Sequence, residues 1–343
     1  MYSQRNRAGL WRRGVTLSIR EMRFAVILNP SKNGADKLRD TFTAAVKRAG
    51  GAEPGYFETT VDDPGRQMTL DAIEQGYNVI VAAGGDGTVR EIAEVLVQRE
   101  VAEGEEQIEM AILPMGTGNL LARNLDMNVD DLKDGINWAL QGTARPVDAV
   151  RIDLERKNGT IDEHVFLVMG GVGIDAEVMD DTRDDLKKKV GPLAYVEAGF
   201  RKMKGSNKPV SFRVGDGEWE KRNVRSVVFA NCGRLQGGFD LVPEAKIDDG
   251  KIDLVVMTPR SPLDWARIFV KTLVRVKRRI PVIEYFQDES FALRTVEPIL
   301  AQLDGDPVGE IIGITARTVP SSLHLRTLQE RRWSANLGTV FKR

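Results

Sequence analysis

The chain has 343 residues, a length that corresponds to two domains of roughly 150 residues each. Hydrophobic residues make up 42% and charged residues 29% of the chain, which is typical of a folded protein and excludes a disordered one. The 49 Lys and Arg residues balance 50 Asp and Glu residues, which excludes the strongly basic surface of a general nucleic-acid binder. One cysteine and two histidines exclude an intrachain disulfide and a Cys/His zinc site.

The apolar stretches are short, and the N-terminus is basic. Uncharged apolar stretches such as 165–174 fall far short of the roughly 18 residues that a membrane-spanning helix needs, so we expect a soluble, cytoplasmic protein. Residues 1–21 are rich in arginine but lack the apolar core of a signal peptide. We interpret them as a basic, disordered extension. A membrane-contacting arm, and an upstream extension before a start at Met22, stay open as alternatives.

Residues 22–148 alternate short apolar runs, each ending in Gly or Pro, with longer segments of helical character. In the last of these segments Val89, Ile92 and Leu96 follow the spacing of one buried helix face. Strands that alternate with helices need crossover connections, so the pattern predicts a Rossmann-like α/β domain with a mostly parallel sheet. The predicted strands are 24–28, 78–83 and 108–113, and the predicted helices are 37–49, 66–75 and 88–98.

After residue 148 the pattern changes to mainly antiparallel β structure, which we expect over 149–327 with a polar tail over 328–343. Asn-Gly or Asp-Gly pairs between apolar runs are a strong hairpin signal, and they occur at 158–159, 216–217, 249–250 and 304–305. The predicted strands include 151–154, 165–169, 224–230 and 252–257. Two helices are predicted, 192–204 and 262–279, and the second opens with an N-cap serine, Ser261, followed three residues later by Asp264.

Two glycine-rich loops follow predicted strands. Residues 84–88, Gly-Gly-Asp-Gly-Thr, lead into a helix, so their backbone can approach a phosphate at the helix N-terminus. Asp86 cannot bind phosphate directly because like charges repel, so it would orient the loop or face a magnesium ion. The second loop, 114–120, offers the hydroxyl of Thr117 and the amide of Asn119 to a nucleotide. The simpler alternatives are a tight strand-to-helix turn for the first loop and a capped turn for the second.

Short motifs follow one another in a specific order. They are Asn29-Pro30-Ser31, residues 84–88, residues 113–119, Pro146-Val147-Asp148, residues 171–176, residues 191–195, residues 237–239 with Pro243, residues 248–250 and residues 303–306. This order resembles the diacylglycerol kinase catalytic-domain family, which includes bacterial diacylglycerol kinases, sphingosine kinases and ceramide kinases. The resemblance covers residues 22–320. It implies an α/β nucleotide-binding domain over 22–148, a β-sandwich over 149–327 and an active site between them.

The resemblance also implies a site for ATP and two sites for Mg²⁺. Asp86 and Asp148 would cooperate around the catalytic metal. The backbone of Lys246 and Lys251, with the carboxylate of Asp249, would hold a second, more structural one. The implied nucleotide contacts are Asn29, Thr60 (or Thr59 in the neighbouring register), Gly84, Gly85, Asp86, Gly87, Thr88, Val89, Arg90, Gly116, Thr117 and Asn119.

By the same resemblance Asp304 is the general base that takes the proton of an acceptor hydroxyl, with Asp306 as a second catalytic carboxylate. Asp306 stands where the family often has Glu, and Leu120 stands where many bacterial members have Asp. The residues alone leave a second reading open, because Asp304-Gly305 is also a hairpin signal.

The function implied is an ATP- and Mg²⁺-dependent lipid kinase, with diacylglycerol, giving phosphatidic acid, as the favoured acceptor. A NAD kinase, which shares the Gly-Gly-Asp-Gly-Thr loop, and a nucleotide-binding regulatory protein without turnover are the alternatives. Basic residues and apolar positions in the predicted helices 192–204 and 262–279 favour peripheral contact with an anionic membrane, with a solvated charged face as the alternative. A homodimer stays open, and no nucleic-acid partner is expected.

Overall fold

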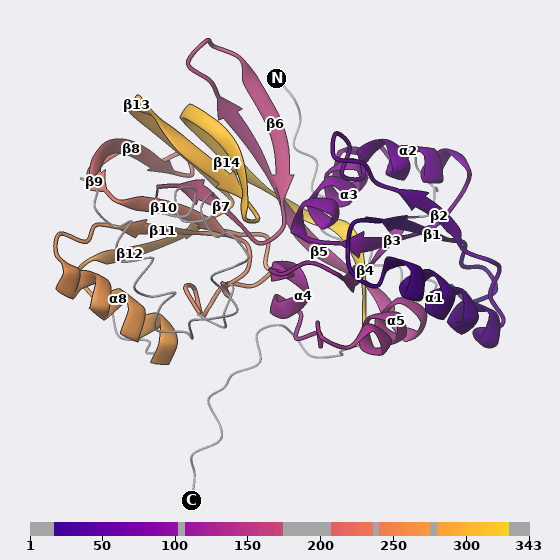
Figure 1. Cartoon of the computed structure of the whole chain (residues 1–343). Helices are drawn as coiled ribbons and strands as arrows, with labels where there is room; N and C mark the ends of the chain where they lie inside the picture. Colours follow the sequence, from indigo (N-terminus) through magenta and orange to yellow (C-terminus); the bar gives the residue numbers. More distant parts are fainter. Residues whose placement is uncertain (1–16, 102–106, 174–206, 236–239, 275–279, 329–343) are drawn as a thin grey trace, which may run out of the picture.

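The computed structural model describes residues 17–101, 107–173, 207–235, 240–274 and 280–328. Figure 1 shows two lobes side by side, an N-terminal lobe in indigo to magenta and a C-terminal lobe in pink to yellow, joined by long strands. The predicted helix 192–204 and the motifs at 191–195 and 237–239 lie outside the described residues.

The N-terminal lobe is built on a parallel sheet. Its strands are β1 (Phe24–Leu28), β2 (Gly55–Glu58), β3 (Val79–Gly84) and β4 (Glu109–Pro114), in the spatial order β4-β3-β1-β2. The pairings are parallel throughout, and Val26, for example, lies opposite Tyr56 on one side and Val81 on the other. Parallel sheets of this kind are covered on both faces, which agrees with the burial of every residue of β1 and β3.

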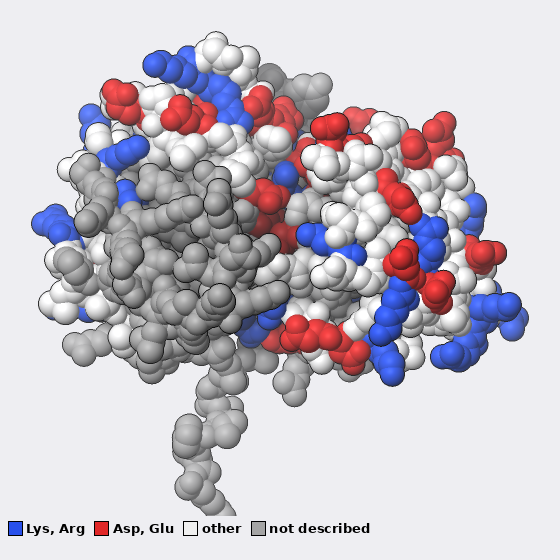
Figure 2. Space-filling model, viewed as in Figure 1, with Lys and Arg blue, Asp and Glu red and all other residues white. Residues whose placement is uncertain are grey.

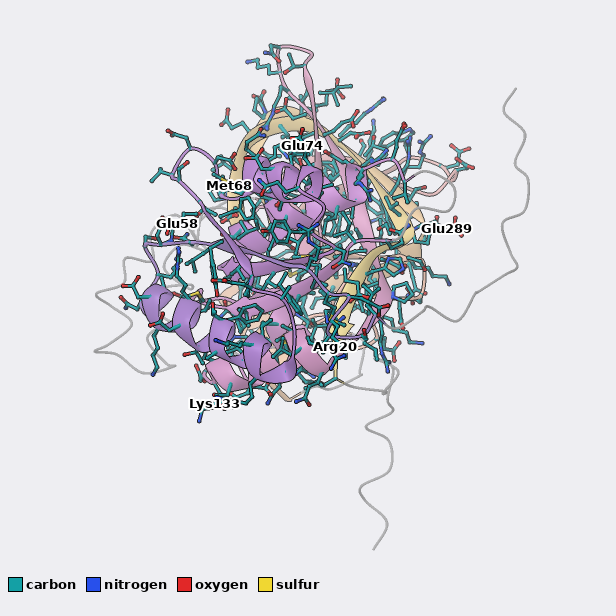
Figure 3. The ribbon with its side chains drawn as sticks, turned by 90° about the vertical axis from the view of Figure 1, so that its right-hand side faces the viewer. Arg20, Glu58, Met68, Glu74, Lys133 and Glu289 are labelled. Atoms are coloured by element: carbon teal, nitrogen blue, oxygen red, sulfur yellow. The ribbon has the colours of Figure 1, made fainter. Side chains whose placement is uncertain are left out.

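Helices cover both faces of this sheet. They are α1 (Ala35–Ala49), α2 (Arg66–Glu74), α3 (Asp86–Gln98), α4 (Leu120–Asn124) and α5 (Leu132–Gln141). α1 and α5 pack on one face, where Phe42 meets Phe24 edge to face, and α2 and α3 pack on the other. In Figure 3, Met68 of α2 and Lys133 of α5 lie on opposite sides of the sheet. Because the faces are covered, the strand ends are left for a ligand.

The C-terminal lobe is mainly antiparallel. Its strands, together with the two long ones that reach into the first lobe, are β5 (Thr143–Glu155), β6 (Ile161–Phe166), β7 (Met169–Val172), β8 (Lys208–Val214), β9 (Glu220–Val224), β10 (Ser226–Ala230), β11 (Ile252–Met257), β12 (Ile283–Asp288), β13 (Ser290–Leu303) and β14 (Asp306–Thr327). They run in the order β12-β11-β10-β7-β13-β14, with β5, β6, β8 and β9 branching from this path. A separate core with Phe212, Phe229 and Phe291 lies inside this lobe.

β5 and β14 run through both lobes, and β14 is the yellow strand that crosses the centre of Figure 1. β14 pairs with β13 at its start, while near its end it pairs in parallel with β4, so one sheet continues from lobe to lobe. β5 pairs with β14 on both sides of a bulge, with Ala149 opposite Val319 and Val147 opposite Leu323. Residues 320–322 of β14 therefore have Asp148 alone opposite them.

Asp148 fixes this crossing point. It is 1% exposed, and its Oδ1 accepts a hydrogen bond from the Ser321 N–H in the bulge at 2.7 Å. Its Oδ2 accepts from the Gly250 N–H at 2.6 Å, and its own N–H donates to the Ile247 carbonyl at 2.7 Å. The side-chain amide of Asn231 donates to the Asp148 carbonyl at 3.0 Å. One buried residue thus holds β5, the bulge of β14 and the 247–250 loop together.

Most of the expected elements are confirmed. The predicted strands 24–28 and 252–257 coincide with β1 and β11, and the hairpin signals at 158–159, 216–217 and 304–305 each join paired strands. The hairpin expected at 249–250 is wrong, because this segment bonds to Asp148 instead. The strand expected over 165–169 is also wrong, since β6 ends at Phe166 and β7 begins at Met169; 224–230 is likewise divided between β9 and β10.

Helix α8 (Pro262–Val274) begins with the predicted cap. The Asp264 N–H donates to Ser261 Oγ at 3.2 Å, and the Ser261 N–H donates to the Asp264 carboxylate at 3.1 Å. Ile268 joins the core, and Lys271 Nζ donates to the Tyr285 hydroxyl at 2.6 Å, so this lysine does not belong to a free basic face. No helix within the described residues has the length and apolar character needed to cross a membrane.

A buried ion pair fixes the end of β14 in the N-terminal lobe. Arg326 pairs with Glu109 of β4, and both side chains are buried. Arg326 also donates to the Ala139 carbonyl at 2.7 Å and to the Gly142 carbonyl, two of the groups that the end of α5 leaves without intrahelical donors. This one side chain therefore joins β14 to β4 and caps α5.

We expect Arg326→Met to lower the free energy of unfolding by about 3–5 kcal/mol, because it leaves Glu109 buried without its partner. Arg317→Met, at an exposed position of the same strand, is the matched control and should change stability by about 0.5 kcal/mol or less. Urea denaturation followed by circular dichroism measures both variants. Equal stability of the two variants would contradict the role given to Arg326.

Candidate active site

The predicted nucleotide-binding segments lie at the carboxyl ends of β1 to β4. Asn29 follows β1, its N–H donates to the Ala83 carbonyl at 3.0 Å, and its Oδ1 accepts from the Ser31 N–H at 3.0 Å. Thr60 follows β2 and Thr117 follows β4; both are exposed. Because carboxyl ends of parallel strands share one edge, the fold brings these four segments together at the place where such sheets bind ligands.

The loop between β3 and α3 presents its backbone rather than its side chains. Gly85 is the N-cap of α3 and has no side-chain cap, and its carbonyl accepts from the Val89 N–H at 3.1 Å. The side chains of Thr88 and Val89 are buried beneath the loop. The first N–H groups of a helix lack intrahelical partners and lie at the positive end of its dipole. The loop therefore offers an anion-binding helix N-terminus.

Asp86 connects this loop to the second one. Its Oδ1 accepts a hydrogen bond from the Leu120 N–H at 2.5 Å. Asp86 therefore orients the loop, which is one of the two roles predicted for this residue. The side chain of Asn119 bonds to both backbone groups of Gly116, at 2.9 and 2.8 Å. A Cβ on Gly116 would lie 2.7 Å from the Gly85 Cα, so the close contact of the two loops requires glycine there.

Asp304 is a hairpin residue and a buried carboxylate at the same time. With Gly305 it connects β13 to β14 at φ values of 48° and 94°, the two-residue turn that Asp-Gly favours. The residue is 5% exposed, and its oxygens accept from the N–H groups of Leu167, Val168 and Met169, each at 2.9 Å. Burial raises the pKa of Asp304, and these three hydrogen bonds oppose the rise. Asp304 therefore holds the break between β6 and β7.

Asp306 is the accessible carboxylate of the same hairpin. Its side chain is 44% exposed, and its Oδ2 lies 3.8 Å from Arg90 Nε. A Cβ on Gly87 would lie 2.9 Å from the same oxygen, so Asp306 is in contact with the first glycine loop. Burial raises the pKa of Asp306, and the positive charge of Arg90 opposes this rise.

Three carboxylates thus converge on the first loop. Burial raises the pKa of Asp86 to about 6, and the negative charges of Asp304 and Asp306 contribute to the rise. In Figure 2, acidic side chains gather in the middle of the displayed face, where the lobes of Figure 1 meet. The site therefore combines an anion-binding backbone with an excess of negative side chains, an arrangement that suits a phosphate and a cation bound together.

Asp148 makes its side-chain hydrogen bonds to a different part of the chain. Burial raises the pKa of Asp148, and the negative charges of Asp249 and Asp248 add to this rise. Both of its carboxylate oxygens accept backbone hydrogen bonds, which oppose it. Asp249 Oδ1 accepts from the Lys251 N–H at 3.1 Å. The hydrogen bonds of the predicted metal-binding residues thus form two sets. Asp86 accepts from the second glycine loop, whereas Asp148 accepts from the loop that contains Asp249.

The donor set fits Mg²⁺ that is shared with a nucleotide. Mg²⁺ prefers oxygen ligands and in such sites uses one or two carboxylates together with phosphate oxygens and water. Asp86 provides such a carboxylate beside the anion-binding loop. Within the parts of the chain that the structure describes, no three His, Cys, Asp or Glu side chains form a complete metal-binding group. The site thus fits a cation that a nucleotide helps to hold.

Two features of the site belong to none of the sequence motifs. The N–H groups held by Asp304 belong to a uniformly apolar run in which no residue type marks a break. Glu94 of α3 is buried, and its carboxylate accepts from the Val165 N–H at 3.1 Å and from Arg66 at 3.0 Å. Its one signal is an acidic residue within the apolar run of a helix, between Ala93 and Val95.

Comparison with known proteins agrees with this geometry. The model of the diacylglycerol kinase catalytic domain matches residues 23–152, and that of the YegS C-terminal NAD kinase beta sandwich-like domain matches residues 169–327. A relative from Stenotrophomonas maltophilia named "Probable lipid kinase YegS-like" is 31% identical over 297 residues, covering 83% of this chain and 90% of the relative. A protein of the same name from Pseudomonas aeruginosa PAO1 is 29% identical, covering 82% and 87%.

The fold is shared with a solved structure. A crystal structure of a diacylglycerol kinase from Bacillus anthracis str. Sterne superposes with a TM-score of 0.62 at 19% identity, covering 89% of this chain and 96% of that one. An α/β lobe with paired glycine loops, a mainly antiparallel second lobe and two matching domain models in the same order converge on one assignment. The chain belongs to the diacylglycerol kinase catalytic-domain family, in its YegS-like branch.

Proposed function

We propose that this protein is an ATP-dependent lipid kinase that transfers the γ-phosphate of ATP to the hydroxyl group of a lipid, with diacylglycerol as the favoured acceptor. The observation that carries the proposal is the position of Asp306, a carboxylate on β14 that contacts Gly87 of the anion-binding loop. The names of the curated relatives support a lipid as the acceptor. Residues 22–148 act as the nucleotide domain and residues 149–327 as the domain that supplies the acceptor side.

ATP binds at the strand ends of the N-terminal lobe. Its phosphates lie against the backbone N–H groups of Gly87 and the first turn of α3, because the side chains of Thr88 and Val89 are turned into the core. Asn29, Thr60, Thr117 and the loop of Gly116 and Asn119 border the rest of the nucleotide. Phosphoryl transfer depends mainly on positioning and on charge stabilisation, which is what this rigid loop pair supplies.

Asp306, rather than Asp304, takes the proton of the acceptor hydroxyl. A general base must come within hydrogen-bonding distance of the hydroxyl, and Asp306 is accessible while Asp304 is 5% exposed and bonded to three N–H groups. The raised pKa of Asp306 brings it closer to the pH at which a base works well. Asp304 then has a different task, because it fixes the hairpin from which Asp306 reaches the loop.

Mg²⁺ is the expected cofactor, held by Asp86 together with the phosphates of ATP. When bound it neutralises charge on the transferring phosphoryl group, and it offsets the repulsion between ATP and the three carboxylates. The second group, the carboxylate of Asp249 with the backbone of Lys246 and Lys251, would hold a structural cation next to Asp148.

Peripheral contact with an anionic membrane completes the proposal. On α8, Leu263, Arg267 and Val270 are exposed and share one face of the helix, since they are four and three residues apart. Arg267 also pairs with Asp264 at 3.1 Å, so this face is mainly apolar with one arginine at its edge, which suits contact with the surface of a bilayer.

The function is tested with γ-labelled ATP, magnesium, and mixed micelles of a bacterial lipid extract supplemented with NAD. We expect label in the organic phase, comigrating with phosphatidic acid. Label in NADP, with none in the organic phase, would instead identify the protein as a NAD kinase. ATP binding without any transfer would identify a nucleotide-binding protein without turnover.

Substitution of the two hairpin carboxylates separates their tasks. Asp306→Asn should fold and bind ATP normally but lose turnover by about 10²- to 10⁴-fold, because the proton acceptor is gone. Asp304→Asn should lose about 1–3 kcal/mol of stability, because an amide group would face backbone N–H donors. Turnover, nucleotide binding and urea denaturation are measured for each. Normal turnover in Asp306→Asn, with turnover lost in a folded Asp304→Asn, would return the role of base to Asp304.

The raised pKa of Asp86 makes stability depend on pH. Since folding raises this pKa from 3.8 to about 6, the folded protein keeps a proton that the unfolded chain releases, and the stability contributed by protonated Asp86 is lost as pH rises from about 4 to 6. Asp86→Asn should therefore exceed the wild type in stability at pH 7.5 by about 3 kcal/mol, and come close to it near pH 4. Urea denaturation in EDTA measures this difference.

Asp216→Asn is the control for this comparison, because it changes an exposed aspartate of another hairpin. It should show no such divergence between the two pH values. Asp86→Asn should also lose turnover despite its higher stability. A stability gap that is the same at both pH values would show that the carboxyl group of Asp86 carries no strain from its surroundings.

A further inference from the structure

Arg90 is a buried cation whose hydrogen bonds are incomplete. It lies one turn into α3, and its side chain is 10% exposed. Its Nη2 lies 3.0 Å from Glu91 Oε1, and its Nη1 lies 3.8 Å from Glu94 Oε2. Within the described residues its Nε and Nη1 have no hydrogen-bond acceptor. Since burying a charge is costly unless it is paired, the surrounding carboxylates must determine where this guanidinium group lies.

One of these carboxylates belongs to β14. Arg90 Nε lies 3.8 Å from Asp306 Oδ2, close enough for an ion pair and longer than a hydrogen bond. Arg90 comes from the helix of the glycine loop, and Asp306 comes from the catalytic hairpin. The same oxygen of Asp306 is the one that faces Gly87. Arg90 thus attracts Asp306 from one side by its charge. On the other side Gly87 lets Asp306 approach closely, because it has no side chain.

Glu94 anchors this arrangement to the second lobe. Its Oε1 accepts from Arg66 Nη1 of α2 at 3.0 Å, and its Oε2 accepts from the Val165 N–H of β6 at 3.1 Å. His164 Nδ1 lies 3.5 Å from the same Oε2. Val165 is followed two residues later by the first of the N–H groups that Asp304 holds. Glu94 therefore joins the helix of Arg90 to the segment that supports the hairpin of Asp306.

We propose that Arg90 is a positioning residue of the phosphoryl transfer, which, held by Glu91 and Glu94, fixes the Asp306 carboxylate beside Gly87 of the nucleotide loop. The inference rests on the proposed function, because it concerns the step in which Asp306 accepts the proton. An Asp306 carboxylate that is already held in place loses no conformational entropy when the reaction occurs, whereas a free side chain would. In this arrangement the charge of Arg90 holds Asp306, and the backbone N–H groups of the loop bind the nucleotide.

The test compares Arg90→Met with Arg66→Met. Both remove an arginine next to Glu94, but Arg66 is not paired with Asp306. Arg90→Met should lower kcat by about 10- to 100-fold while KM for ATP stays within about twofold of the wild type. Arg90→Lys should recover part of kcat, because it keeps the charge, and Arg66→Met should keep wild-type kinetics. Arg90→Gln carries the same comparison if Arg90→Met does not fold.

The two roles of Arg90 separate in these measurements. A higher KM for ATP at an unchanged kcat would make Arg90 a nucleotide contact and would overturn the proposal. The double variant Arg90→Met/Asp306→Asn should be no slower than Asp306→Asn, because both act through one group. Multiplying losses in the double variant would overturn it too.

A crystal structure of Arg90→Met gives a readout that needs no turnover. Displacement of the Asp306 carboxylate from Gly87 supports the positioning role, and an unmoved carboxylate contradicts it. If the wild type transfers phosphate to no lipid, the proposed function fails, and this readout still decides whether Arg90 fixes Asp306.

Discussion

The crossing of β5 and β14 between the lobes is the constraint on which the site depends. β14 carries Asp306 at its first residue and Arg326 near its last, so one continuous strand connects the hairpin of Asp304 and Asp306 with the parallel sheet that holds the glycine loops. Asp148 sets the bend of this strand by holding the bulge at Ser321. A change in that bend would move the hairpin relative to the loops. The buried carboxylate at the crossing therefore affects the position of the hairpin through this strand.

The electrostatics of the site follow from what the backbone already supplies. The glycine loop offers N–H groups that attract anions, whereas Asp86, Asp304 and Asp306 surround it with negative charge that burial makes costly. Arg90 compensates part of this charge. A phosphate alone would meet repulsion there, and a cation alone would meet the positive end of α3. A phosphate and a cation bound together would interact favourably with both the N–H groups and the carboxylates. Such a ligand pair would explain why three carboxylates lie where their burial destabilises the fold.

The sequence predicted much of this arrangement, and the failures have physical causes. Glycines and Asp-Gly pairs predict loops and turns correctly because they act locally, as at 84–88 and 304–305. The break at Leu167 could not be expected, because it is caused by a carboxylate more than a hundred residues away that takes three consecutive backbone N–H groups. The position of Asp148 opposite the bulge of β14 could not be predicted either, because the two segments are also far apart in the sequence. Contacts of this range leave no mark on periodicity.

The return of β14 to the first lobe also governs when that lobe can be completed during synthesis. β4 ends at residue 114, but its partner positions on β14 are His324 and Leu325, about 210 residues further along the chain. At about 5–20 residues per second a ribosome needs roughly 10–40 seconds to make the intervening segment. Throughout that interval β4 presents an unpaired edge of an apolar sheet, a surface to which other chains can add a strand. The nascent protein is therefore most exposed to misassembly after its glycine loops have been synthesised, and chaperone binding should be concentrated in that interval.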